Sequence, residues 1–228
     1  MDQLTIQSYP TIREQVYEYI RRAILSGGIT SGKRLSEAKL SKDIGTSRTP
    51  VREALHKLEM EKLVQSLPRV GYVVREITET EIKEICEIRL ALETLAAKWA
   101  STRISAKELA RLGKIILLTE NHIKRNGTSA VVKLDTEFHD ILCKASKSER
   151  IEELSQSLRD QMLKFRMKGL CFTEIARRSN EGHRRILQAV KSKKINRIES
   201  AVRFHLGRTE KDMTNLFRGD GQLKSKSH

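Results

Sequence analysis

Acidic and imidazole side chains recur at spacings that would let a helical protein bind a metal ion. Asp135 and His139 are four residues apart, so both project from one face of a helix. His183 follows 44 residues after His139 and His205 another 22 residues on, each within its own predicted helix. One carboxylate and three imidazoles suit Zn, Ni, Mn, Co or Fe and leave coordination positions open. On spacing alone, the alternative is an exposed helix pair and two unrelated histidines.

A second group of residues is suited to contact a nucleic acid. Arg48, Thr49 and, one turn on, Arg52 stand near the start of a predicted helix. Arginine can donate two hydrogen bonds to guanine, threonine can bond a phosphate or a base, and a helix N-terminus favours a phosphate. Contacts that position the protein on a nucleic acid are expected from Lys33, Arg34, Lys39 and Arg69. The alternative is that these are solvated charges on a small helical domain.

The basic group lies in a segment, residues 10–75, whose pattern is three helices followed by a hairpin. The first helix is predicted over about 11–25, with an apolar face formed by Ile12, Val16, Tyr19, Ile20 and Ile24. A second helix is predicted over 36–44, and Thr49 is predicted to cap the third with Pro50 in its first position. β-Branched residues around a Pro/Gly turn predict a hairpin over 64–74. This order is the outline of a winged helix-turn-helix.

The histidines lie in the second segment, residues 79–217, which shows helical periodicity almost throughout. Thr78 with Glu81, and Ser105 with Glu108, have the spacing of capping boxes that open helices. Six helices are predicted, at about 79–102, 106–124, 129–145, 148–171, 174–191 and 194–217. We therefore expect a mainly α protein, with an N-terminal winged helix-turn-helix and a C-terminal all-helical bundle of about six helices. His56 and His122 are predicted to lie on the surface.

The charge of the chain agrees with a nucleic-acid partner but does not locate the contact. The 228 residues include 44 Lys and Arg against 29 Asp and Glu, a formal net charge of +15. Residues 1–75 account for +5, residues 76–159 for zero and residues 160–228 for +10. The larger excess is therefore in the C-terminal segment, where it would favour anionic ligands or add non-specific attraction to DNA.

Composition also excludes several classes of protein. The longest apolar runs are far shorter than the roughly 18 residues that a membrane span needs. The opening residues, MDQLTIQSYP, lack the basic start and apolar stretch of a secretory signal. Three widely spaced cysteines, Cys86, Cys143 and Cys171, are odd in number and form no CxxC pattern. They indicate reduced thiols, so we expect a cytoplasmic protein without disulfides.

The first segment resembles the GntR family of bacterial transcriptional regulators. The resemblance is carried by Arg34-Leu35-Ser36-Glu37, by Ser47-Arg48-Thr49-Pro50-Val51-Arg52-Glu53-Ala54-Leu55 and by Gly71-Tyr72. It departs from the usual pattern at Ala38, where many members have a basic residue, and at Lys62, where glycine is usual. The resemblance implies DNA binding through Arg48, Thr49 and Arg52, with contacts from Arg34, Lys39 and Arg69.

The second segment is similar to the all-helical FCD effector domain of the FadR-type subfamily. Its marks are Arg89-x-x-Leu92-Glu93, Asp135-x-x-Phe138-His139, Glu181-x-His183 and His205-Leu206. In metal-containing members an Asp, the His one turn later and two later His bind one divalent cation, and Asp135, His139, His183 and His205 occupy these positions. The resemblance implies a divalent ion, with zinc the first choice and Ni, Mn, Co or Fe as alternatives.

Such domains are understood to sense small organic acids. Arg89 is the first candidate to pair with a carboxylate of the effector, and Arg166 is the second. The alternative for Arg89 is an ion pair with Glu93, four residues on.

The resemblance therefore predicts a homodimeric repressor that binds a pseudo-palindromic operator in double-stranded DNA, in the bacterial cytoplasm at the nucleoid, and that responds to a small carboxylate. One alternative is a metal-responsive regulator in which the cation itself is the signal. Another is a metal-dependent hydrolase, since an Asp/His site with open positions could activate water. No general base or nucleophile stands near these ligands in the sequence, so we do not expect an enzyme.

Overall fold

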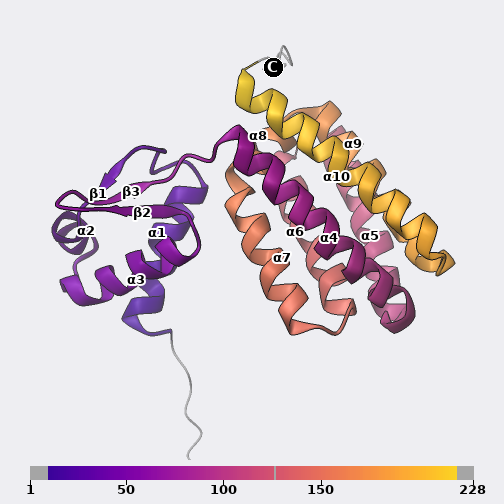
Figure 1. Cartoon of the computed structure of the whole chain (residues 1–228), viewed down its shortest axis with the longest axis horizontal. Coiled ribbons are helices and arrows are strands. Elements are labelled where there is room, and N and C mark those ends of the chain that lie inside the picture. Colours follow the sequence, from indigo (N-terminus) through magenta and orange to yellow (C-terminus); the bar gives the residue numbers. More distant parts are fainter. Residues whose placement is uncertain (1–9, 126, 220–228) are drawn as a thin grey trace, which may run out of the picture. The chain divides into compact units, whose positions relative to one another are not determined.

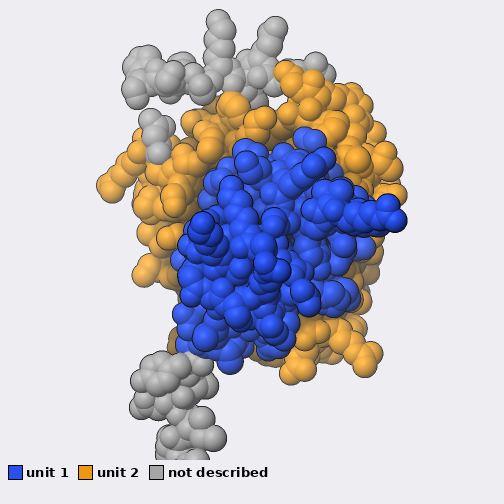
Figure 2. All heavy atoms as spheres, turned by 90° about the vertical axis from the view of Figure 1, so that its left-hand side faces the viewer, with its two compact units in different colours: residues 1–76 blue, residues 77–228 orange. Residues whose placement is uncertain are grey.

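The chain divides into two compact units at residues 76 and 77 (Figures 1 and 2). The computed structural model describes residues 10–125 and 127–219. The first nine residues, on which the prediction of no export signal rests, lie outside this described part. The division falls in the gap between the two predicted segments, residues 10–75 and 79–217.

The first unit is a winged helix-turn-helix. Its elements are α1 (Ile12–Leu25), β1 (Arg34–Leu35), α2 (Glu37–Ile44), α3 (Arg48–Met60), β2 (Val64–Leu67) and β3 (Gly71–Val74) (Figure 1). The predicted hairpin is β2 and β3, which pair antiparallel with Val64 opposite Val74. The short strand β1 was not predicted; it pairs with the other edge of β3 and completes a three-stranded sheet in the order β1-β3-β2.

Helix α3 begins two residues earlier than its Thr-Pro sequence predicts. Ser47 is the N-cap in an extended conformation, so Arg48 and not Pro50 opens the helix, and Pro50 is its third residue instead of its first. Proline is tolerated there because the first N–H groups of a helix have no partner within it. Arg48 is therefore the first residue of the helix.

A small apolar core holds α3 against α1. Val51, Ala54, Leu55 and Leu58 of α3 are each fully buried, and α1 contributes Ile20. The predicted inner face of α1 is partly wrong, because Ile12 and Tyr19 are 62% and 59% exposed while Tyr17 is buried. The Tyr17 hydroxyl donates to Glu61 at the end of α3, and burial together with this carboxylate raises the pKa of Tyr17.

The second unit is a helical bundle, as predicted. Its helices are α4 (Glu79–Arg103), α5 (Ala106–Lys124), α6 (Thr128–Ala145), α7 (Glu149–Gln161), α8 (Leu163–Leu170), α9 (Thr173–Ser192) and α10 (Ile195–Arg218). Both predicted capping boxes are present, with Thr78 and Glu81 opening α4 and Ser105 and Glu108 opening α5. No helix in the described part of the chain is long and apolar enough to cross a membrane.

The helix predicted over 148–171 is divided into α7 and α8 at Met162. The N–H of Met162 reaches the carbonyl of Leu158 only at 3.4 Å, while its side chain is fully buried in an apolar cluster with Ile82 of α4. Neither Pro nor Gly marks this point in the sequence, so packing within the fold outweighs a helical pattern that runs through it.

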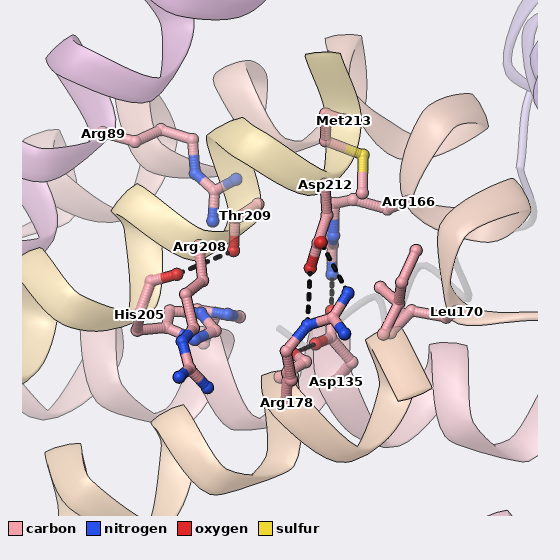
Figure 3. Close-up of a pocket in the computed structure, with 13 residues that line it drawn as sticks. Arg89, Asp135, Arg166, Leu170, Arg178, His205, Arg208, Thr209, Asp212 and Met213 are labelled. Atoms are coloured by element: carbon pink, nitrogen blue, oxygen red, sulfur yellow. Dashed lines mark hydrogen bonds and ion pairs between the residues drawn. The ribbon is translucent and has the colours of Figure 1, made fainter. Parts of the chain in front are cut away.

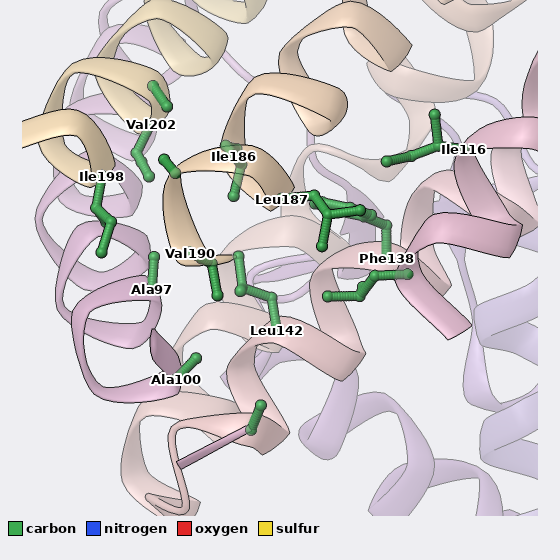
Figure 4. Close-up of a cluster of buried hydrophobic side chains, with 14 of the residues drawn as sticks. Ala97, Ala100, Ile116, Phe138, Leu142, Ile186, Leu187, Val190, Ile198 and Val202 are labelled. Carbon is green, nitrogen blue, oxygen red and sulfur yellow. The ribbon is translucent and has the colours of Figure 1, made fainter. Parts of the chain in front are cut away.

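The main core lies between α4, α5, α6, α9 and α10 (Figure 4). Phe138 and Leu142 of α6 pack in one cluster with Ile186 and Val190 of α9 and Val202 of α10. Burial of each such side chain stabilises the fold by about 1.5–3 kcal/mol. Because Phe138, Ile186 and Val202 are near His139, His183 and His205 in sequence, the same packing fixes the helices that carry the histidines.

Candidate functional site

Three helices bring the predicted metal ligands together in the interior of the bundle. Asp135 and His139 lie one turn apart on α6, His183 on α9 and His205 on α10, and all four are at least 95% buried. The ring nitrogens of the three histidines lie within 4.8 Å of one another. Nε2 of His183 is 3.2 Å from Nε2 of His139 and 3.6 Å from Oδ1 of Asp135.

The cluster of three histidines is consistent with a site for a divalent cation. Zinc–nitrogen bonds are about 2.0–2.1 Å, so two imidazoles on one ion have ligand atoms roughly 3.0–3.4 Å apart. Burial and the neighbouring His205 lower the pKa of His183 well below its usual value. Burial and His139 lower the pKa of His205 to about 3. Both rings are therefore neutral at pH 7 and have a lone pair to share with a metal ion.

Gly182 permits the close approach of α9 to α10 at this point. It immediately precedes His183, and a Cβ there would overlap Nδ1 of His205 and lie 3.0 Å from Cβ of His205. The sequence pattern gave no reason to single out this glycine, because its backbone is ordinary helix and only its neighbour on α10 requires the missing side chain.

We expect Gly182→Ala to lower metal affinity by about tenfold or more, because the new methyl group must displace His205. Gly207→Ala is the matched control: it is also helical, but a Cβ there meets nothing within 4 Å. That control should leave metal affinity unchanged and stabilise the fold by up to about 1 kcal/mol. Metal titration of both purified proteins distinguishes them, and equal affinities would contradict this role for Gly182.

Asp135 is held by side chains from two further helices. Arg166 of α8 donates to its Oδ2, and the hydroxyl of Ser179 on α9 donates to its Oδ1 at 3.0 Å. Burial raises the pKa of Asp135, but the Arg166 guanidinium and the nearby histidines outweigh burial and bring it below its usual value. Arg166, predicted to bind an effector, is thus at the site but has a carboxylate partner of its own.

Glu93 joins Arg89 to one of the histidines. Arg89 Nε donates to Glu93 Oε1 at 2.8 Å, and Glu93 Oε2 is 3.0 Å from His139 Nδ1, all within the buried interior. The pair with Glu93, given above as the alternative for Arg89, is therefore formed. Even so, Arg89 Nη1 is buried without a hydrogen-bond partner among the described residues, so the guanidinium retains a donor. Sequence spacing had not marked Glu93 as a neighbour of His139.

A pocket opens onto this cluster and is lined by arginines. Its walls include Arg89, Arg166, Arg178 and Arg208, together with Asp135, His139 and His205 (Figure 3). Figure 3 shows Arg89 extending toward His205 and Thr209 of α10. Arg178 Nη2 donates to Asp212 Oδ1 at 2.6 Å on the other side. The empty space is about 430 Å³ including the opening to solvent, and each of its four guanidinium groups has a carboxylate partner in the structure.

The residues predicted to contact DNA all lie in the first unit. Arg48 and Thr49 are exposed at the start of α3, Arg34 is exposed on β1, and Lys39 is exposed near the start of α2. Arg69 is exposed in the turn between β2 and β3 with a left-handed φ of 63°. Arg52 is also exposed, but its guanidinium is bound by Glu37, as described below. His56 is exposed as predicted, whereas His122 is half-buried.

Comparison with known proteins agrees with both units. Residues 12–74 match the family described as bacterial regulatory proteins, gntR family, and residues 84–208 match the FCD domain. The HTH-type transcriptional regulator YdhC of Bacillus subtilis is 31% identical over 78% of this chain and 80% of its own length. The gluconate operon transcriptional repressor of the same species is 32% identical over 76% of this chain and 73% of its own length.

A solved structure supports the fold along nearly the whole chain. The structure titled E. coli McbR/YncC superimposes with a TM-score of 0.75 and covers 91% of this chain and 99% of its own, at 21% identity. The two family matches together extend from residue 12 to residue 208, and both named relatives are transcriptional regulators. The chain therefore belongs to the gntR family of bacterial regulatory proteins: it is a DNA-binding transcriptional regulator with an FCD domain, and not an enzyme.

Proposed function

We propose that the chain is a repressor whose affinity for DNA is controlled by a small organic acid bound beside a metal ion in the FCD domain. One observation carries the proposal: a buried cluster of three histidines, with Asp135 beside it, borders a pocket whose walls include four arginines. The gluconate operon relative is a repressor by name, which supports the sign of regulation. In this proposal the protein acts in the bacterial cytoplasm, where its DNA partner lies.

In this proposal the ligand set is Asp135, His139, His183 and His205. A divalent cation at these residues would supply a Lewis-acidic centre for a carboxylate oxygen, and zinc suits the donors best, with Ni, Mn, Co or Fe as alternatives. Arg166 and Ser179 hold the Asp135 carboxylate in place, and Glu93 orients the His139 ring. Such outer partners fix ligand geometry before any effector arrives.

The effector is recognised by Arg89 in this proposal. Its Nη1 is buried and lacks a partner among the described residues, and Arg89 is one of the residues that line the pocket, so a carboxylate of the effector would satisfy this donor. Arg166 would contribute less, because Asp135 already neutralises its charge. An effector with one group at the cation and a carboxylate at Arg89 would touch α4, α6, α9 and α10 at once, and so would favour one arrangement of these helices over another.

Thermal unfolding of the metal-loaded full chain with a panel of small mono-, di- and hydroxycarboxylates tests the effector. At least one acid at about 100 times its dissociation constant should stabilise the fold by about 2.7 kcal/mol and raise Tm accordingly. Arg89→Ala should remove this rise, while Arg177→Ala, an exposed arginine of α9 paired with Glu174, should keep it. A panel in which no acid raises Tm would count against the proposal.

A homodimer would present two α3 helices to the halves of a pseudo-palindromic operator. One face of α4 is suited to the contact, because its apolar residues follow each other at spacings of four, three and four, at Ile88, Leu92, Leu95 and Trp99. Ile88, Leu95 and Trp99 remain 50%, 38% and 36% exposed. An exposed apolar stripe of this kind is typical of an interface between subunits.

Leu95→Glu should therefore weaken self-association by roughly 30-fold or more, since the symmetry of a dimer places the substitution twice in the interface. Sedimentation equilibrium of the full chain measures this. Leu117→Glu is the control, because Leu117 lies on α5, outside the stripe, and is 62% exposed. A wild-type protein that is monomeric, or a Leu95→Glu protein that associates like wild type, would contradict the interface.

A further inference from the structure

Arg52, the second arginine of α3, is bound by the carboxylate of Glu37 from the preceding helix, α2. Arg52 Nε donates to both carboxylate oxygens of Glu37, at 3.0 and 3.1 Å, and Arg52 Nη2 donates to Glu37 Oε2 at 2.9 Å. Glu37 is the first residue of α2, and Arg52 lies in α3. The two residues are 15 positions apart, so the contact depends on the angle between the two helices.

The contact uses only one edge of the guanidinium. Nε and Nη2 form the edge that faces Glu37, which leaves Nη1 and the second hydrogen of Nη2 at the far end. That end is the part that can donate two hydrogen bonds to O6 and N7 of guanine. The Arg52 side chain is still 66% exposed, and Arg48 lies one helical turn before it. The pair with Glu37 thus restricts the orientation of the Arg52 side chain. It does not cover the donor groups at the far end of the guanidinium.

A carboxylate at this position is unfavourable for DNA affinity as such. Arg52 lowers the pKa of Glu37, and Arg48 lowers it further, so the carboxylate is ionised and its charge lies close to the residues expected to meet DNA. An ionised carboxylate repels phosphates. Glu37 also favours the N-terminus of α2, but any acidic residue in that first turn would do so. Stabilisation of the helix N-terminus does not explain why Glu37 makes a bidentate contact with Arg52.

We propose that Glu37 is a positioning residue that sets DNA sequence specificity: it holds the Arg52 guanidinium in one orientation and reduces binding to DNA of other sequences. A free arginine side chain loses conformational freedom when it is ordered, which costs free energy. Ordering it before DNA binds removes most of this cost from the specific complex. The inference rests on DNA binding, which the family establishes, and is independent of any metal or effector.

The experiment uses the full chain and a duplex selected from a random pool by the wild-type protein, with a scrambled duplex of equal length. Glu37→Gln should bind the selected duplex about tenfold more weakly and the scrambled duplex equally well or more tightly, because a negative charge has gone. Glu53→Gln is the matched control: it removes the same charge from α3, where Glu53 faces Arg13 at 3.9 Å and not Arg52. It should leave the ratio of the two affinities unchanged.

A double-mutant cycle shows whether Glu37 acts through Arg52. In the Arg52→Ala background, Glu37→Gln should no longer reduce the affinity ratio. Two results would overturn the proposal. The first is that Glu37→Gln lowers the ratio of the two affinities equally in the wild-type and the Arg52→Ala backgrounds, or lowers it in neither. The other is tighter binding of Glu37→Gln to the selected duplex, which would mean that Glu37 withholds Arg52 from DNA. Thermal unfolding of each variant confirms that the domain is folded, since both side chains of the pair are at the surface.

Discussion

Replacing His183 with alanine should reduce metal affinity by at least about a hundredfold, and metal bound to the purified protein should fall to near zero. Nε2 of His183 lies 3.2 Å from Nε2 of His139 and 3.6 Å from Oδ1 of Asp135, so its loss removes one of the three imidazoles of the proposed ligand set. Substitution of a residue that hydrogen-bonds to a metal ligand typically lowers metal affinity or activity 10–100-fold. The loss of a ligand itself should lower metal affinity further. Elemental analysis and competition with a chelator measure the effect.

The control for this experiment is His56→Ala, which removes an exposed imidazole from α3 of the first unit. It should leave the metal content at the wild-type value. His183 also stacks on Phe138, with ring centroids 4.1 Å apart, so His183→Ala will loosen the core. The same measurements are therefore made on His205→Ala, which changes a ring on a different helix, α10. Far-UV circular dichroism shows whether each variant is folded, and a folded variant that binds metal like wild type would contradict the ligand assignment.

Replacing Arg48 with alanine should weaken binding to the selected operator about 10- to 100-fold. Arg48 is the first residue of α3 and is exposed, and in a helix-turn-helix the N-terminal residues of the second helix reach the base edges. A bidentate contact of arginine with guanine discriminates against the wrong base by about 1–3 kcal/mol. Arg48→Ala should also bind scrambled DNA more weakly, but by a smaller factor, because there it loses only a phosphate contact.

Lys107→Ala removes the same charge from the exposed start of α5 in the other unit. It should change neither affinity by more than about twofold, since Lys107 lies outside the unit that matches the DNA-binding family and a single surface charge is screened at physiological salt. Fluorescence anisotropy at two salt concentrations separates specific from non-specific effects. An Arg48→Ala protein that keeps the wild-type preference for its operator would show that α3 does not contact bases through this residue.

Local signals in the sequence predicted the helix boundaries where a capping residue was present. The Thr78/Glu81 and Ser105/Glu108 boxes are formed as expected, because they need only residues three apart. The division at Met162 had no such signal, since it results from burial against α4. The Thr49 cap was wrong because Ser47, two residues earlier, adopts the extended conformation of an N-cap.

The three histidines that cluster in the bundle could be predicted because residue type and family pattern single them out. Their surroundings could not. Glu93, Gly182 and Asp212 meet the site only because α4, α9 and α10 converge there, and no spacing within one helix shows this. The contact of Glu37 with Arg52 was likewise invisible, because it depends on how α2 and α3 cross.

Part of the basic excess of the C-terminal segment lies around the pocket. Arg166, Arg178 and Arg208 are all among its residues and all line the pocket. They pair with Asp135, Asp212 and Glu181, so several of these charges are already balanced within the unit. These ion pairs leave little of the C-terminal charge at the pocket to attract an anionic ligand.

The most direct test of the account is the affinity of the full chain for its selected duplex, with and without metal and with and without the acid that most raises Tm. For the metal-loaded protein, the acid should weaken DNA binding by about tenfold or more, and linkage requires DNA to weaken acid binding by the same factor. For the metal-stripped protein, the acid should have no effect. If metal alone changes the affinity and the acid adds nothing, the cation is the signal. A DNA affinity that responds to neither would contradict the proposed control.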